Sequence, residues 1–145
     1  MSELALLDNS VWARLRDGRI AGDAAAPLLE RIENGRVAVT EPSLLEMLYS
    51  SRDGHEFAAL AELLAALPRF SLDAPAADLA VNAQAQLAAA PGVSHRVKPI
   101  DLLVAAVAAR NGIAVLHYDA DYDTIAEHTH LEFESVWAAA RGSAG

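Results

Sequence analysis

Three aspartates follow one short apolar run in the last third of the sequence. The run is residues 113–116, and Asp119, Asp121 and Asp123 come directly after it. A short apolar run preceded by an Asn-Gly pair is typical of a buried strand entered through a turn. Open α/β sheets bind ligands at the carboxyl ends of such strands. Crowded carboxylates repel one another until protons or cations neutralise them, and oxygen ligands suit Mg²⁺ and Mn²⁺.

The same stretch also fits a solvated acidic loop. In that interpretation the aspartates only cap the next expected helix, residues 121–127, because short acidic side chains accept hydrogen bonds from the first backbone N–H groups of a helix. The stretch alone does not decide between a ligand site and a cap. The positions of the other acids in the chain are therefore needed to choose between these two interpretations.

Asp8 occupies a similar place near the start of the sequence. It follows the apolar run 4–7, which is typical of a central parallel strand. It precedes residues 11–15, which begin a helical pattern. Asn9 or Ser10 can cap that helix, so we expect Asp8 between the end of a strand and the start of a helix.

Two more acids are expected on helices that are otherwise apolar. Glu46 lies on or beside the buried stripe of a helix that starts after Thr40. An ionised carboxylate there is costly unless it is paired or binds a metal. Asp101 lies in the first turn of the strongly apolar helix 100–108, where it equally suits the positive end of the helix dipole.

Composition narrows the class of protein. The 145 residues predict one domain, 1–145, and 53% of them are hydrophobic, which predicts a globular chain. The chain has no cysteine, which excludes disulfides, a thiol nucleophile and cysteine-ligated metals. We see no membrane-length apolar run and no basic secretory start, so we expect a cytoplasmic protein. The net charge of −9 argues against a general nucleic-acid coat protein, and Lys98 is the single lysine.

Short apolar runs alternate with helical patterns along the whole chain. The expected strands are 4–7, 36–39, 68–72, 113–116 and an edge strand within 131–137 that is followed by a helical tail. The expected helices start near residues 11 and 43 or span 22–34, 53–67, 74–90, 100–108 and 121–127. This alternation predicts a layered α/β fold with a mainly parallel sheet. In such a fold, strand carboxyl ends and helix amino ends share one edge, where the acids can meet.

Four motifs together resemble a known family. They are LLDNSVWARL (6–15), TEPSLLEMLYS (40–50), HRVKPIDLLVAAVA (95–108) and VLHYDADYD (115–123). Their order and apolar contexts resemble PIN-domain ribonucleases, and more narrowly the VapC-like toxins of type II toxin–antitoxin pairs. The resemblance covers residues 4 to about 133.

The resemblance implies a three-layer α/β/α PIN-like domain that cleaves RNA with Mg²⁺ or Mn²⁺ and metal-activated water. It implies the catalytic acids Asp8, Glu46, Asp101 and Asp119, and a metal set formed by these four with Asp121. It further implies three residues that contact RNA or antitoxin, namely Ser10, Arg96 beside His95, and His117, where many members have Thr or Ser. It also implies a homodimer, a heterotetramer or larger assembly with antitoxin, and a cognate antitoxin whose basic tail occupies the acidic site.

Other classes of protein fit this pattern less well. A non-catalytic module whose acidic edge binds a basic peptide remains the alternative. A phosphatase with Asp8 as nucleophile expects a second aspartate where Ser10 stands. A calcium loop starting at Asp119 expects Gly at its sixth position and Glu at its twelfth, but Thr124 and His130 are there. His128 and His130 are too few ligands for zinc.

Overall fold

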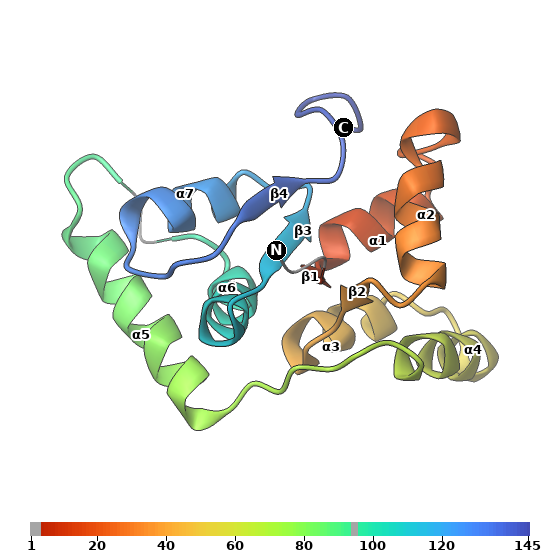
Figure 1. The fold of residues 1–145 in the computed structure, drawn as a ribbon, viewed down its shortest axis with the longest axis horizontal. Helices are drawn as coiled ribbons and strands as arrows, with labels where there is room; N and C mark the ends of the chain where they lie inside the picture. The colour runs from red at the N-terminus through yellow and green to blue at the C-terminus, as the bar shows by residue number, and fades with distance from the viewer. Residues whose placement is uncertain (1–3, 94–95) are drawn as a thin grey trace.

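The computed structural model describes residues 4–93 and 96–145, and its centre is a four-stranded parallel sheet (Figure 1). The strand order is β2-β1-β3-β4, with β1 at Ala5–Leu7, β2 at Val37–Ala38, β3 at Ala114–His117 and β4 at Ser135–Trp137. Ala5 pairs with Val37 on one side and with Ala114 on the other. The chain thus leaves β1 in one direction to form β2 and later returns to the opposite side to form β3.

Seven α-helices and one short 3₁₀ helix connect these strands within the described residues. They are α1 (Asn9–Arg16), the 3₁₀ helix η1 (Gly22–Ala24), α2 (Ala26–Glu33), α3 (Glu41–Tyr49), α4 (Gly54–Ala65), α5 (Ala74–Ala89), α6 (Pro99–Asn111) and α7 (Asp121–His128). None of these helices is long and apolar enough to cross a membrane.

Alternate residues of β1 face two separate hydrophobic cores. Leu6 packs in the core formed with α5, α6 and α7, whereas Ala5 and Leu7 pack in the core formed with α1, α2, α3 and α4. This alternation is the two-residue period of a strand covered on both faces. Figure 1 shows α5, α6 and α7 on one side of the sheet and α1, α2 and α4 on the other. The predicted three-layer α/β/α architecture is therefore confirmed.

Three expected elements differ from the structure. The predicted helix 22–34 is divided into η1 and α2. Pro27 lacks the N–H that the interior of a continuous helix needs, so it lies in the first turn of α2, which begins at Ala26. The predicted strand 68–72 is reduced to one bridge, between Val39 and Arg69. The backbone N–H of Leu72 instead donates to the Glu41 carboxylate, which directs the segment away from the sheet.

The helical tail expected after 137 is also absent. The segment 138–145 is irregular, and it is held by a 2.7 Å hydrogen bond from the backbone N–H of Ala144 to the hydroxyl of Tyr118. Arg14 completes this attachment, since it donates to the Gly145 carbonyl and stacks over the Tyr118 ring. The edge strand itself is present as β4, which confirms that part of the prediction.

Candidate metal centre

Asp8 is fixed at the carboxyl end of β1 by three hydrogen bonds. Its side chain accepts from the backbone N–H of Ser10 at 3.0 Å, from the Ser10 hydroxyl at 2.5 Å and from the Tyr122 hydroxyl at 2.7 Å. The carboxylate is almost fully buried. Asp8 is itself the N-cap of α1, so the expectation that Asn9 or Ser10 caps this helix is wrong. The Asp8 carboxylate thus caps α1 and also accepts the hydroxyl of Tyr122 from α7.

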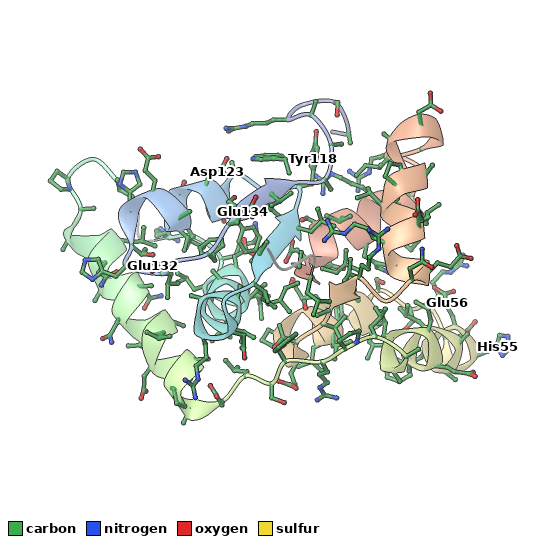
Figure 2. All side chains as sticks on the ribbon, in the orientation of Figure 1. His55, Glu56, Tyr118, Asp123, Glu132 and Glu134 are labelled. Atoms are coloured by element: carbon green, nitrogen blue, oxygen red, sulfur yellow. The ribbon has the colours of Figure 1, made fainter. Side chains whose placement is uncertain are left out.

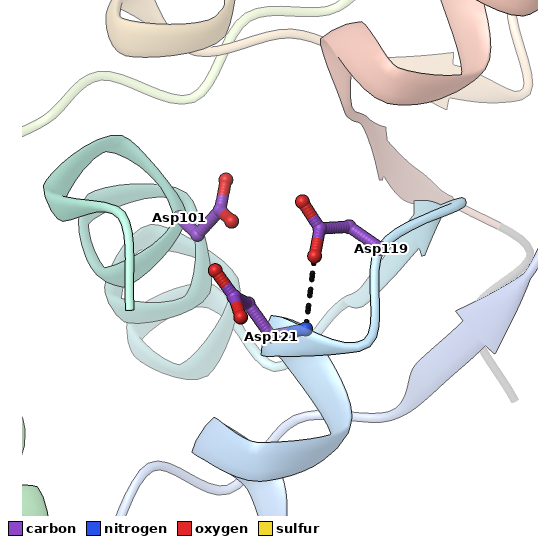
Figure 3. Close-up of side chains that lie close together, drawn as sticks. All are labelled: Asp101, Asp119 and Asp121. Atoms are coloured by element: carbon purple, nitrogen blue, oxygen red, sulfur yellow. Dashed lines mark hydrogen bonds between the residues drawn. The ribbon is translucent and has the colours of Figure 1, made fainter. Parts of the chain in front are cut away.

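Asp101, Asp119 and Asp121 come together beside it. Asp101 reaches in from the first turn of α6, Asp119 follows β3, and Asp121 begins α7 (Figure 3). One oxygen from each carboxylate lies within 4.8 Å of the other two. The backbone N–H of Asp121 donates to Asp119 at 2.9 Å and holds this loop in shape. The centre therefore lies between β1 and β3, where the strand order reverses, which is the ligand position of open α/β sheets.

Asp101 carries the strongest signal for a missing partner. It is 2% exposed, and its Oδ2 has no hydrogen-bond partner. Burial raises the pKa of Asp101 to about 8, and the negative charges of Asp8 and Asp119 act in the same direction, while Lys98 opposes them. A buried carboxylate in this state is stabilised by a cation more than by any neutral neighbour.

Lys98 is the cation that the structure places there. Its Nζ hydrogen-bonds Asp119 and lies 3.4 Å from the Oδ2 atoms of Asp101 and Asp121. Burial by itself lowers the pKa of Lys98. The hydrogen bond to Asp119 and the charges of the three carboxylates have a larger, opposite effect, so the pKa lies well above its usual range. For Asp119, burial raises the pKa, but hydrogen bonds from Lys98 and from the Asp121 backbone bring it below its usual value.

Glu46 belongs to the same electrostatic group. It lies half-buried on α3, next to the fully buried Met47. Burial raises the pKa of the Glu46 carboxyl, and repulsion from Asp8 and Asp119 raises it further, against the attraction of Lys98. All four acids named from the sequence as catalytic are thus brought into one region of the molecule.

The donors of this region fit a hard divalent cation. Asp8, Glu46, Asp101, Asp119 and Asp121 offer only oxygen atoms, and Oδ2 of Asp101 has no hydrogen-bond partner. Mg²⁺ and Mn²⁺ prefer oxygen donors, whereas the sulfur ligands of softer metals are absent from this chain. We therefore describe the group as a candidate metal centre.

The three residues expected to contact RNA or antitoxin differ in position. Ser10 donates to Asp8 and accepts from the backbone N–H of Tyr118 at 2.9 Å, so its hydroxyl joins α1 to the end of β3. Arg96 is exposed and lines a shallow pocket of about 310 Å³ with Asp121. His95, its partner in the motif, lies outside the described residues.

His117 is fully buried, so the contact with RNA or antitoxin expected for it does not suit its position. Its Nδ1 accepts from the backbone N–H of Asp119 at 3.1 Å, which leaves the proton on Nε2, 2.7 Å from the Ser135 hydroxyl. Burial lowers the pKa of His117, which keeps the ring neutral. The ring also stacks on Tyr122 at 4.8 Å. His117 therefore supports Asp119 and Tyr122 from inside the fold.

Asp123 does not join the acidic group although it follows Asp121 closely in the sequence. It lies on α7 beside β4 (Figure 2), where it accepts 2.7 Å and 2.9 Å hydrogen bonds from Ser135 and Trp137. Two residues along a helix turn a side chain by about 200°, so Asp121 and Asp123 point in opposite directions. Asp123 attaches the edge strand to α7.

Sequence reasoning missed two residues of the centre, Tyr122 and Lys98. Tyr122 is fully buried with its hydroxyl toward Asp8, and burial followed by the charges of Asp8 and Asp101 raises its pKa well above the usual value. Its spacing of three from the buried Ile125 was a signal for an inward-facing helix position. Lys98 precedes Asp101 by three residues, which was the signal for its approach to that carboxylate.

The parallel sheet, its two helical layers and the acids at one edge define an α/β/α domain with an acidic centre. The PIN domain family model matches residues 5–128, and the chain belongs to this family. It is 33% identical over 138 residues to ribonuclease VapC18 of Mycobacterium tuberculosis, covering 94% of this chain and 96% of that protein. It is 38% identical over 124 residues to ribonuclease VapC51 of the same species, covering 86% of each.

Solved structures share the fold. The DNA-bound VapBC complex of Salmonella typhimurium contains a chain that matches with a TM-score of 0.69 and 19% identity, covering 96% of this chain and all of that one. FitAcB of Neisseria gonorrhoeae contains a chain that matches with a TM-score of 0.62 and 18% identity, covering 91% and 96%. The resemblance named from the four sequence motifs is thereby confirmed.

Proposed function

We propose that this protein is a metal-dependent endoribonuclease toxin that hydrolyses RNA phosphodiester bonds and is neutralised by a cognate antitoxin. The observation that carries the proposal is the buried Asp101 Oδ2, which has no hydrogen-bond partner and only the Lys98 ammonium at 3.4 Å, beside Asp119 and Asp121 in a chain of the PIN domain family. The relatives named ribonucleases support the substrate class. Such a toxin would act on RNA in the cytoplasm.

Four aspartates of the centre are proposed to hold the ion, and Glu46 approaches it from a separate helix. Asp8, Asp101 and Asp119 are the proposed metal-holding aspartates, and Asp121 adds a fourth carboxylate from the start of α7. Mg²⁺ or Mn²⁺ held there would supply an activated water and neutralise charge on the phosphodiester. Glu46 approaches from α3, where its raised pKa suits either direct ligation or a hydrogen bond to a water in the site.

Arg96 is the proposed phosphate contact. It is exposed at the edge of the centre, in the same shallow pocket as Asp121. A guanidinium offers two parallel donors that match the geometry of a phosphate. Because the chain is acidic overall, it needs such a cation close to its substrate. The net charge of −9 means that cations at the site, rather than the surface as a whole, attract the RNA.

The proposed antitoxin site is an apolar groove between α1, α2 and α4. It has a volume of about 820 Å³ and is lined mainly by the side chains of Trp12, Leu29, Ile32, Leu63 and Leu67. Leu29 and Leu63 are each about half exposed, and exposed apolar groups gathered in one place are typical of a protein-binding surface. We propose that an apolar antitoxin segment fills this groove while its basic tail reaches the acids.

A second exposed apolar surface lies on α3. Leu45 is 68% exposed and Tyr49 is 92% exposed. Large apolar side chains so open to water are typical of surfaces that another protein covers. We propose this face for the homodimer, and for the heterotetramer or larger assembly that forms when antitoxin is bound.

RNA cleavage by the purified protein tests the proposed function. We expect cleavage with Mn²⁺ or Mg²⁺, no cleavage with EDTA, and loss of at least about 100-fold in Asp8→Asn and Asp101→Asn, since each removes a charged group from the reacting region. Asp78→Asn, an exposed acid on α5, is the matched control and should cleave like wild type. A protein that binds a basic peptide without any metal and cuts no RNA would instead be a non-catalytic binding module.

A further inference from the structure

The single lysine of the chain points its ammonium into the acidic centre. Lys98 precedes α6, and its Nζ contacts the same three carboxylates that come within 4.8 Å of one another. The contacts are a hydrogen bond to Asp119 and distances of 3.4 Å to Asp101 and Asp121. No other lysine exists elsewhere in the sequence. The ammonium therefore occupies the space that these carboxylates offer to an ion.

A divalent ion held by these carboxylates would lie about 2.1 Å from their oxygens. An ammonium that touches the same oxygens would then lie within a few ångströms of that ion, and two positive charges at this separation repel strongly in a partly buried site. An ammonium and a divalent ion would therefore compete for these oxygens, because the three oxygens lie within 4.8 Å of one another and each cation must contact all of them.

The side chain of Lys98 is free to leave without disturbing the fold. It is 59% exposed, and a flexible four-carbon stem carries the ammonium. The backbone N–H of Lys98 donates separately to Asp121 at 3.3 Å, so the main chain stays attached when the side chain swings out. The displaced ammonium would remain at the rim of the centre, because its backbone stays in place.

We propose that Lys98 is an internal counter-ion of the centre, which occupies the three-aspartate site in the ion-free protein and must be displaced by the divalent ion. This inference rests on the proposed metal centre. It has two consequences: Lys98 stabilises the crowded carboxylates before the ion binds, and it lowers the apparent affinity for the ion. Lys98 thus sets the ion concentration at which the centre is filled.

Ion binding in the absence of RNA tests this proposal. We would measure Mn²⁺ affinity from the electron paramagnetic resonance signal of free Mn²⁺, and Mg²⁺ affinity by calorimetry. If Lys98 occupies the site for four-fifths of the time, Lys98→Met should bind Mn²⁺ about fivefold more tightly. Lys98→Arg keeps a cation on the same loop and should restore the lower affinity.

The matched control is Arg52→Met. Arg52 is 86% exposed and pairs with Glu56 on α4, so this variant removes one positive charge away from the centre. It should bind Mn²⁺ like wild type. If Arg52→Met gained as much Mn²⁺ affinity as Lys98→Met, the net charge would be responsible. The proposed exchange of the Lys98 ammonium for the divalent ion would then be wrong. Thermal unfolding of each variant establishes that it is folded before its affinity is compared.

A second measurement uses the wild-type protein and needs no substitution. Because Lys98 is the single lysine, protein grown with lysine labelled at the ε-carbon gives one lysine signal by nuclear magnetic resonance. Saturation with diamagnetic Mg²⁺ should move this signal to the position of a free lysine side chain and sharpen it. A signal that stays unchanged while calorimetry shows Mg²⁺ bound overturns the exchange.

The possible results separate this inference from the proposed function. If neither wild type nor any variant binds Mn²⁺ or Mg²⁺, the metal centre and the exchange both fail. If wild type and Lys98→Met bind ions equally well, only the exchange fails. Weaker binding by Lys98→Met would mean that Lys98 assists the ion, which also contradicts the exchange and leaves the metal centre intact.

Discussion

The hydroxyl of Tyr122 donates a 2.7 Å hydrogen bond to Oδ1 of Asp8, and it joins residues 114 positions apart in the sequence. Both side chains are buried, so water does not compete for this bond. The other Asp8 oxygen is held by Ser10. Together these bonds fix the direction in which Asp8 faces the centre.

Removing this hydroxyl should affect both stability and cleavage. We expect Tyr122→Phe to lower the free energy of unfolding by about 1.5–3 kcal/mol, the range for a hydrogen bond to a charged group. It should also lower RNA cleavage, because Asp8 loses one of its fixed donors. Urea unfolding and cleavage rates measure the two effects. Ser71→Ala removes a hydroxyl from an exposed side chain outside the centre and should change neither.

The raised pKa of Asp101 predicts a pH dependence of stability in the ion-free protein. Folding raises this pKa from about 3.9 in an unfolded chain to about 8, so the folded protein holds a proton that the unfolded chain releases. Stability should therefore fall as the pH rises from about 4 to about 8. Asp101→Asn lacks this titration and should gain stability relative to wild type over that window.

The comparison is made with EDTA present, from unfolding curves at several pH values. The advantage of Asp101→Asn should grow with pH by at most about 1.4 kcal/mol per unit. Asp78→Asn, on the exposed face of α5, controls for the loss of one negative charge. A constant difference between Asp101→Asn and wild type at all pH values would contradict the raised pKa.

Asp121 and Asp123 form a matched pair with opposite expected effects. Asp121→Asn removes a carboxylate from the three-aspartate group and should weaken Mn²⁺ binding while the fold stays stable. Asp123→Asn should leave ion affinity unchanged but destabilise the fold by about 1–2 kcal/mol, because Ser135 and Trp137 lose a charged acceptor. Calorimetry and urea unfolding of both variants test these expectations. Equal effects of the two substitutions on ion binding would show that Asp121 and Asp123 do not have these separate roles.

The apolar groove predicts where antitoxin binding can be broken. Leu29→Glu and Leu63→Glu place a charge in the groove at side chains that are about half exposed, so the fold should tolerate them while the antitoxin cannot bury them. We expect both variants to lose co-purification with the proposed antitoxin. Val81→Glu, at a 68% exposed position on α5, is the control. Normal complex formation by both groove variants would exclude this surface.

Local sequence patterns predicted the layers and the acids, because both depend on short-range order. The strands 4–7 and 113–116 and the helix 100–108 were visible as apolar runs, and Asp8, Asp119 and Asp101 were visible near their respective ends. The strand expected at 68–72 was lost to a contact made 31 residues away, from Leu72 to Glu41. The tail depends on Tyr118, 26 residues before Ala144.

The direction in which each side chain points was the second feature that the sequence could not predict. Asp119, Asp121 and Asp123 look equivalent in the sequence, but the start of α7 between them turns Asp123 toward β4. His117 resembled a surface polar residue, but the strand register pairs it with Trp137 and places its ring beneath Tyr122. The spacing of Lys98 from Asp101 indicated one of its contacts, but its contacts with Asp119 and Asp121 require α6 and the loop after β3 to be placed together.

The pairing of Ala5 with Ala114 also has a consequence for the newly made chain. The centre needs Asp8 from the first strand and Tyr122 from the last helix, so it has high contact order and cannot form from the amino-terminal part alone. During translation, β1 must wait until β3 and α7 have emerged from the ribosome. Asp8 and Glu46 therefore cannot form the complete centre until the segment up to Tyr122 has been synthesised, so a partial chain that ends before this residue lacks the centre.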